Sequence, residues 1–276
     1  MQDGEAPMIS SIGNNANTLS SVPANRNTDT LNRTLNQLSS GKRVNSAADD
    51  AAGSAIIQQF AAQIAGNGQA VRNLSDGISL TQVADGALSQ LSDNAIDQRT
   101  LAVAAGNSTL SPEDRAALQA QSDALSQSSQ DILKNTQFNG QQLLQGNGFT
   151  LQAGANANET IAIPGTSLNS LSSPSGTLDL SSPTSAGNAI SALDNDVTSI
   201  NSSRATLGAI SNRLSASANN LLTSNENLSA AKSRIGDTDY ASASSTLIQS
   251  QIRNQADLAV RAQANASAGQ VLSLLR

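Results

Sequence analysis

The fold follows from residues 207–235, LGAISNRLSASANNLLTSNENLSAAKSRI, in which large apolar side chains recur every seven residues. This repeat consists of Leu207, Leu214, Leu221, Leu228 and Ile235. A sustained seven-residue repeat places one apolar stripe along a helix, and a second helix must cover that stripe along its length. Most of the intermediate positions are small or polar, so the stripe is weak by itself. The stretch therefore predicts a long helix that needs partners.

The N-terminal half supplies a matching helix. Its seven-residue repeat consists of Ile57, Ile64, Val71 and Ile78, and the intermediate register holds Phe60, Leu74, Leu88 and Ala95. Residues 24–111 and 184–276 contain no proline, which would interrupt a helix. Two helices of about 50 residues would each extend about 75 Å. We predict a mainly α fold, an elongated rod of paired N- and C-terminal long helices.

The middle of the chain breaks this pattern. Residues 138–187 contain three prolines and several glycines, which exclude a continuous helix. Within this region, FTLQAG (149–154) and ETIAIPG (159–165) alternate apolar and polar residues and predict a short β-hairpin. Before it, Ser111 and Pro112 mark the start of a shorter helix, with serine as the cap. We assign residues 151–185 to the hairpin and an exposed loop.

Composition argues against several classes of protein. The chain has no cysteine and no histidine, which excludes disulfides, thiol nucleophiles, His-dependent triads and HExxH zinc sites. Charged residues make up 13% and the net charge is −6, so no basic stripe is available for nucleic acid. No apolar run reaches the length of a transmembrane helix. We therefore expect a structural protein with no catalytic residues, no cofactor, no nucleic-acid partner and no membrane insertion.

Four carboxylates could suggest a divalent-cation site. They are Asp49 and Asp50 near one expected helix start, and Asp237 and Asp239 near another. Carboxylates at such positions more often interact with the positive end of a helix dipole, and that interpretation is favoured here. We predict no metal site.

The first residues, MQDGEAPMISSIGNNANTL, carry acids in place of a basic region and lack an apolar core, so they are not predicted to be a secretory signal peptide. Residues 1–7 are interpreted as an extension, and Met8 is an alternative start. If the protein leaves the cytoplasm, another export route is expected.

Several motifs resemble those of bacterial flagellins. LSSGKRVNSAADDAAGSA (38–55) is similar to the most characteristic segment of that family, and NLSDGISLTQVADGALSQL (73–91) and NTQFNG (135–140) follow at family-like spacing. The C-terminal half adds SRIGDTDYA (233–241) and ends in QANASAGQVLSLLR (263–276). The resemblance extends over nearly all residues from Met8 onward, in the same order.

The resemblance implies a self-assembling subunit of an extracellular flagellar filament. It further implies an inner coiled-coil domain (8–40 with 241–276), a spoke (41–53 and 237–240) and a helical rod domain (54–150 with 186–236). The variable outer domains of larger flagellins are absent. Implied partners are other copies of the chain and, by family resemblance, an export chaperone, capping proteins and junction proteins. Export would follow the flagellar type III route without signal-peptide cleavage.

The two ends carry one-sided apolar stripes that suit contacts in a polymer core. We predict that Leu31, Leu35, Leu38, Ile248, Ile252, Leu274 and Leu275 form that core. Such ends are too short to fold securely alone and would gain their missing core on assembly.

Flagellins that activate the animal innate receptor carry a motif of the form QRVRELAV, and the matching stretch here is IDQRTLAV (96–103).

That motif is degenerate in this chain. Arg99 and Leu101 are retained, but Asp97 replaces an arginine and Thr100 a glutamate. Gln121 falls where the family has a second contact, a glutamate. The resemblance therefore implies weak activation of the receptor or none. Two alternative functions stay open from the sequence: a hook-filament junction protein, and a flagellin-like surface adhesin or ligand-binding protein.

Overall fold

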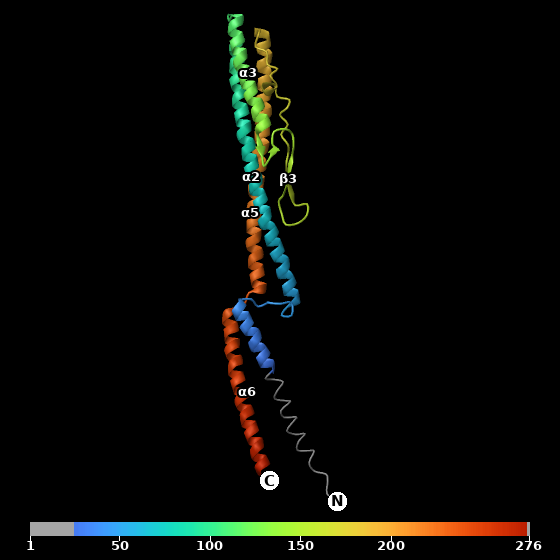
Figure 1. Ribbon diagram of the computed structural model, residues 1–276, viewed down its shortest axis with the longest axis vertical. Helices are drawn as coiled ribbons and strands as arrows, with labels where there is room; N and C mark the ends of the chain where they lie inside the picture. Colours follow the sequence, from blue (N-terminus) through green and yellow to red (C-terminus); the bar gives the residue numbers. More distant parts are fainter. Residues whose placement is uncertain (1–24, 275–276) are drawn as a thin grey trace. The chain divides into compact units, whose positions relative to one another are not determined.

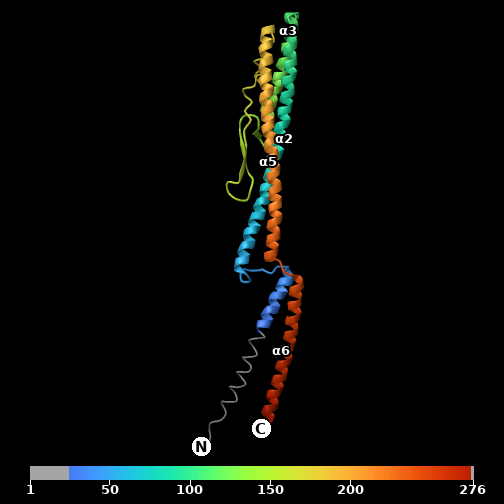
Figure 2. The same cartoon turned by 180° about the vertical axis from the view of Figure 1, so that it is seen from behind.

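The computed structural model describes residues 25–274 (Figures 1 and 2). The chain is mainly helical, which confirms the predicted fold class. A helix over residues 25–40 is followed by α2 (Ala51–Ala105), α3 (Pro112–Asn135), β1 (Gln137–Phe138), β2 (Gln141–Gln142), β3 (Phe149–Gln152), β4 (Thr160–Ile163), α4 (Ser172–Ser175), α5 (Pro183–Gly236) and α6 (Tyr240–Leu274). The chain divides into a central unit, residues 62–227, and a terminal unit, residues up to 61 with those from 228 onward.

In the central unit, α2, α3 and α5 lie side by side (Figures 1 and 2). The main core cluster is leucine-rich and includes the fully buried Leu74, Leu88, Leu144, Ile200 and Leu214. A second cluster is built mostly from small side chains, among them Ala95, Ala102, Ala105, Ala186 and Ala189, with Leu178, Leu180 and Leu193. Burial of these apolar side chains, at about 1.5–3 kcal/mol for each large one, is the main stabilising term of the unit.

Capping fixes the turn between α2 and α3. Ser111 accepts a hydrogen bond from the Asp114 amide (3.1 Å) and Asp114 reciprocates, which makes a capping box, with Pro112 in the first turn as predicted. The buried Arg115 guanidinium donates to the carbonyls of Ala105 (3.2 Å) and Asn107 (3.0 Å). These bonds satisfy carbonyls at the end of α2.

The seven-residue repeats are placed unequally. On α5, Leu207 and Leu214 are buried, whereas Leu221, Leu228 and Ile235 are half-buried. On α2, Ile57, Ile64, Val71 and Ile78 are all half-buried, and the buried register is the intermediate one, with Leu74, Leu88 and Ala95. In the central unit several elements surround α2, so it buries a broad face and no single narrow stripe dominates.

The predicted hairpin is confirmed. β3 and β4 pair antiparallel with Phe149 opposite Ile163 and Gln152 opposite Thr160. On β4, Ile161 and Ile163 are buried in the main cluster, while alternate residues face outward. The side-chain amide of Asn73 on α2 donates a hydrogen bond to the backbone carbonyl of Gln152 (3.1 Å) and holds the hairpin against α2.

A second, two-residue-per-strand ribbon of β1 and β2 was not predicted. Its turn is Asn139–Gly140, and both residues have positive φ, 50° and 77°. An Asn-Gly pair between strands is the sequence signature of this tight turn.

The predicted exposed loop within 151–185 is wrong for its second half. Residues 168–181 run over the helices of the central unit and bury Leu168, Leu171, Leu178 and Leu180. They also contain the short helix α4, which contacts α3. The leucines occur here as two separate pairs, spaced three and two residues apart, and a single pair is too short to establish a helical or strand periodicity.

In the terminal unit, helix 25–40 and α6 lie side by side (Figure 1). The side-chain amide of Asn27 donates a hydrogen bond to the backbone carbonyl of Ser250 (2.8 Å). Apart from two glycines, the buried residues in the described part of this unit are Thr34, Val44, Ala243 and Ser250. Among the described side chains, no large apolar one of either helix is fully buried here, although Leu31, Leu38 and Leu247 are half-buried.

Candidate functional site: terminal helices and connecting segments

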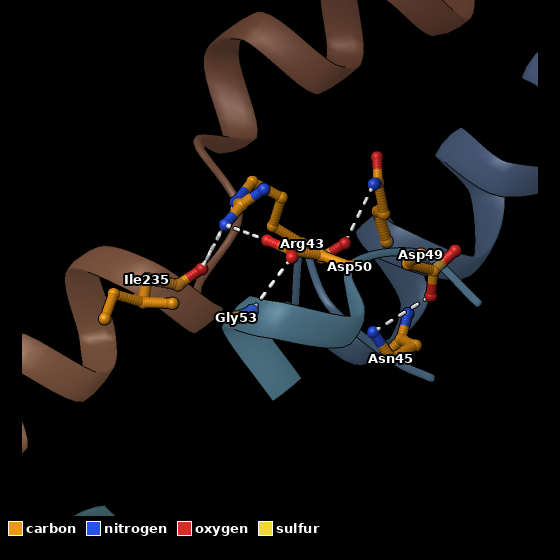
Figure 3. A network of polar contacts seen from close by, with 7 residues as sticks. Arg43, Asn45, Asp49, Asp50, Gly53 and Ile235 are labelled. Atoms are coloured by element: carbon orange, nitrogen blue, oxygen red, sulfur yellow. Dashed lines mark hydrogen bonds and ion pairs between the residues drawn. The ribbon is translucent and has the colours of Figure 1, made fainter. Parts of the chain in front are cut away.

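Two connecting segments, residues 41–50 and 237–239, interrupt the helices of the terminal unit. Arg43 is the centre of their hydrogen-bond network (Figure 3). Its guanidinium donates to the Ile235 carbonyl at the end of α5 (2.6 and 3.2 Å), and its amide donates to the Gly236 carbonyl (2.7 Å). It also lies 3.6 Å from an Asp50 carboxylate oxygen. A cation at a helix C-terminus is favoured by the free carbonyls and the helix dipole.

The same network caps the start of α2. Asp50 accepts a hydrogen bond from the Gly53 amide (2.8 Å), so one carboxylate serves both the helix start and Arg43 (Figure 3). The segments are also joined backbone to backbone, by the Thr238 amide to the Gly41 carbonyl (3.0 Å) and a bridge between Lys42 and Asp237. Gly41 has φ of +69°, a conformation that glycine adopts at little cost.

The remaining carboxylates have local partners. Asp49 accepts bonds from the amides of Ser46 (3.0 Å) and Asn45 (3.1 Å), and its pKa is lowered chiefly by the Ser46 hydrogen bonds. Asp239 caps α6 by accepting from the Ala241 and Ser242 amides (3.0 and 3.1 Å). Asp50 and Asp239 therefore lie at helix starts as interpreted, whereas Asp49 accepts from amides of the preceding loop. Asp237 accepts from the Ser233 hydroxyl near the end of α5 (2.5 Å). Within residues 25–274, no cluster of three or more candidate metal-ligating side chains occurs.

The predicted polymer-core residues lie mostly at the surface. Leu35, Ile248 and Ile252 are 44%, 55% and 60% exposed, and Leu258 and Val260 on α6 are more exposed still. Leu31 and Leu38 are half-buried. The side chain of Leu274, and Leu275 altogether, lie outside the described residues. On α6, Ala243 and Ser250 are buried and Leu247 is half-buried, whereas both isoleucines are exposed. Much of the apolar surface of this helix is therefore left uncovered.

The residues of the degenerate receptor motif separate into two groups on the central unit. Asp97, Leu101 and Gln121 lie together and, with Ala124 and Leu125, line a shallow pocket of about 500 Å³ between α2 and α3. Arg99 is held elsewhere, by its guanidinium hydrogen bond to Asp194 on α5 (2.6 Å). That hydrogen bond, with the charge of Asp194, raises the pKa of Arg99.

Sequence reasoning missed the role of Arg43. The residue is exposed and has no periodic relation to its partners at positions 50 and 235. The signal available in the sequence was the position of Arg43 between two predicted helices, in a segment that resembles a flagellin motif.

Among the described residues, none of the helices has the length and apolar character that a membrane span requires.

Comparison with known families gives two matches. Residues 9–148 match the bacterial flagellin N-terminal helical region, and residues 190–275 match the bacterial flagellin C-terminal helical region. Together they cover α2, α5 from residue 190 onward and both connecting segments.

Several known proteins are similar to this chain. A flagellin of Halalkalibacterium halodurans is 40% identical over 88% of this chain and 91% of its own length. A flagellar filament 30.7 kDa core protein of Treponema maltophilum is 36% identical over 93% of this chain and 98% of its own. The crystal structure of Bacillus cereus flagellin superposes with a TM-score of 0.51 at 30% identity, and the match covers 54% of this chain and 88% of that chain. The chain therefore belongs to the bacterial flagellin family.

Proposed function

We propose that this protein is a structural subunit of a bacterial flagellar filament that polymerises with copies of itself. The observation that carries the proposal is the exposure of large apolar side chains on α6 in the terminal unit. Ile248 and Ile252 are exposed, while Ala243 and Ser250 are buried and Ser250 accepts the hydrogen bond from helix 25–40. Large apolar side chains left exposed gain free energy when a second subunit covers them.

The connecting segments support the same role. Arg43 and Asp50 join the end of α5 to the start of α2. The connecting segments that lead into the terminal helices therefore begin at a defined position. A polymer of identical subunits needs terminal helices that start from the same place in each copy. Export without a cleaved signal peptide and the chaperone, capping and junction partners belong to this proposal through the family resemblance.

The proposal is tested by Ile252→Ser, with the neighbouring Gln251→Ser as the matched control. Both positions are exposed, but only Ile252 is apolar. Burial of an isoleucine side chain contributes about 1.5–3 kcal/mol, so Ile252→Ser should raise the critical concentration for seeded polymerisation about 10- to 100-fold. Gln251→Ser should change it little. Electron microscopy and sedimentation of seeded samples measure the result.

Filaments of Ile252→Ser that grow at the wild-type critical concentration would show that this face of α6 does not contact another subunit. The same assay separates the alternatives from the sequence. A junction protein or a surface adhesin would not propagate long filaments from its own seeds, whatever the residue at position 252.

A further inference from the structure

Residues 168–181 form a strap over the central unit, between β4 and α5. We propose that the strap is held by two separate side-chain anchors, Asp196 and Gln119, and that its two halves open independently about an exposed turn at Gly176. The first half is residues 168–175 and the second half is residues 178–181.

The first anchor is a buried carboxylate on α5. Asp196, 4% exposed, accepts hydrogen bonds from the backbone amides of Ser172 (3.0 Å) and Ser173 (2.7 Å) at the start of α4. Burial raises the pKa of Asp196, and the two amide hydrogen bonds oppose that rise. Because both amides are satisfied by one side chain, the first turn of this half is fixed to α5.

A polar contact on the inner side continues this anchor. The Ser173 hydroxyl donates to the Gln98 side-chain oxygen. The Gln98 amide group donates in turn to the Ser122 carbonyl (2.9 Å) and the Ser126 hydroxyl (2.8 Å) on α3. All four side chains are buried, and the first half is thereby tied to α2 and α3 as well as to α5.

The second anchor is an amide on α3. Gln119 donates from its nitrogen to the Leu178 carbonyl (2.9 Å) and accepts at its oxygen from the Leu180 amide (2.7 Å). The side chain thus satisfies one acceptor and one donor of the second half, as a neighbouring β-strand would. It shares no partner with Asp196.

The two halves also belong to different parts of the core. Leu168 and Leu171 pack in the main cluster, whereas Leu178 and Leu180 pack in the alanine-rich second cluster. Between them, Ser175, Gly176 and Thr177 are exposed, and Gly176 turns the chain with φ of +70°. Each half has its own anchor and its own burial, so opening one half leaves the interactions of the other intact.

Amide hydrogen exchange of the full-length monomer, followed by mass spectrometry, tests the proposal. Asp196→Asn retains the shape of the side chain but leaves one of the two amides without an acceptor. Exchange in 171–175 should rise on the order of tenfold while exchange in 178–181 is unchanged. Asp194→Asn is the control, because Asp194 is on the same helix but is exposed and paired with Arg99. Gln119→Met should give the opposite pattern, with faster exchange only in 178–181.

A further variant, Ser172→Pro, removes one amide donor and leaves Asp196 in place. Leu171 has φ −68° and ψ 140°, which suit the residue before a proline, and proline is accepted at the first helical position. Exchange should again rise only in 171–175, so this variant decides the first anchor if Asp196→Asn does not fold. Two results would overturn the proposal. One is exchange in Asp196→Asn and Ser172→Pro that equals that of Asp194→Asn, and the other is acceleration of both halves together in any single variant.

Discussion

The central and terminal units bury their side chains in opposite ways. In the central unit, leucines such as Leu74, Leu88 and Leu214 are fully buried, and the buried Gln98 and Arg115 side chains are hydrogen-bonded. In the terminal unit, Thr34 and Ser250 are buried while Ile248 and Ile252 are exposed. The first arrangement supplies its own core. The second leaves large apolar side chains exposed, and under the proposed function these are the side chains that another subunit covers.

Removal of residues 241–276 should have the largest effect on this comparison. The exposed apolar side chains of α6 are lost, so we expect no filaments after seeding at concentrations where the full chain polymerises completely. The central unit keeps all its core residues, and its thermal unfolding should change little. Electron microscopy and circular dichroism measure the two results. Filaments of normal appearance from the truncated chain would show that assembly does not depend on α6.

A core substitution in the central unit should have a large effect on stability. Leu214→Ala removes a fully buried leucine and should lower the free energy of unfolding by about 2–5 kcal/mol. Leu222→Ala, eight residues later on the same helix and 53% exposed, should stay within about 0.5 kcal/mol of wild type. Denaturant titration of both variants gives the comparison. Equal losses would mean that the seven-residue stripe of α5 is not the buried face.

The smallest expected effect concerns the innate receptor. Asp97 lies with Leu101 and Gln121 at the shallow pocket, and its negative charge replaces an arginine of the family motif. We expect weak receptor activation by the wild type and a partial gain with Asp97→Arg, because Gln121 still departs from the family glutamate. A cell reporter assay measures both, with Asp93→Arg, an exposed position one turn earlier, as the control. Strong signalling by the wild-type protein would contradict this reading of the motif.

Periodicity was sufficient to predict the long helices and the hairpin, because a stripe of Leu and Ile every seven residues and an alternating pair of short segments each have one favoured structure. The start of α3 was equally predictable from Ser111 and Pro112. The buried register of α2 was not, since burial depends on how many elements surround the helix. Leu74 and Leu88 are buried in the central unit, while the repeat that begins at Ile57 is half-buried.

The strap and the Arg43 network escaped prediction for a different reason. Asp196 is 24 residues from Ser172, and Arg43 is 192 residues from Ile235, so no local pattern records either pairing. Of the candidate assembly residues, the sequence placed Ile248 and Ile252 on one stripe of a helix. It could not show that Ala243 and Ser250 of α6 would be buried while both isoleucines stay exposed.

The two connecting segments differ in length, and this has a mechanical consequence. Ten residues separate helix 25–40 from α2, whereas three separate α5 from α6. Fully extended, the longer segment reaches about 35 Å and the shorter about 10 Å. A force that pulls on both terminal helices therefore fully extends the shorter segment first, while the longer segment is still partly folded back. The Arg43 hydrogen bonds to Ile235 and Gly236 attach the longer segment to the end of α5, next to the start of the shorter segment. Under such a force these hydrogen bonds would be stretched before the longer segment becomes fully extended.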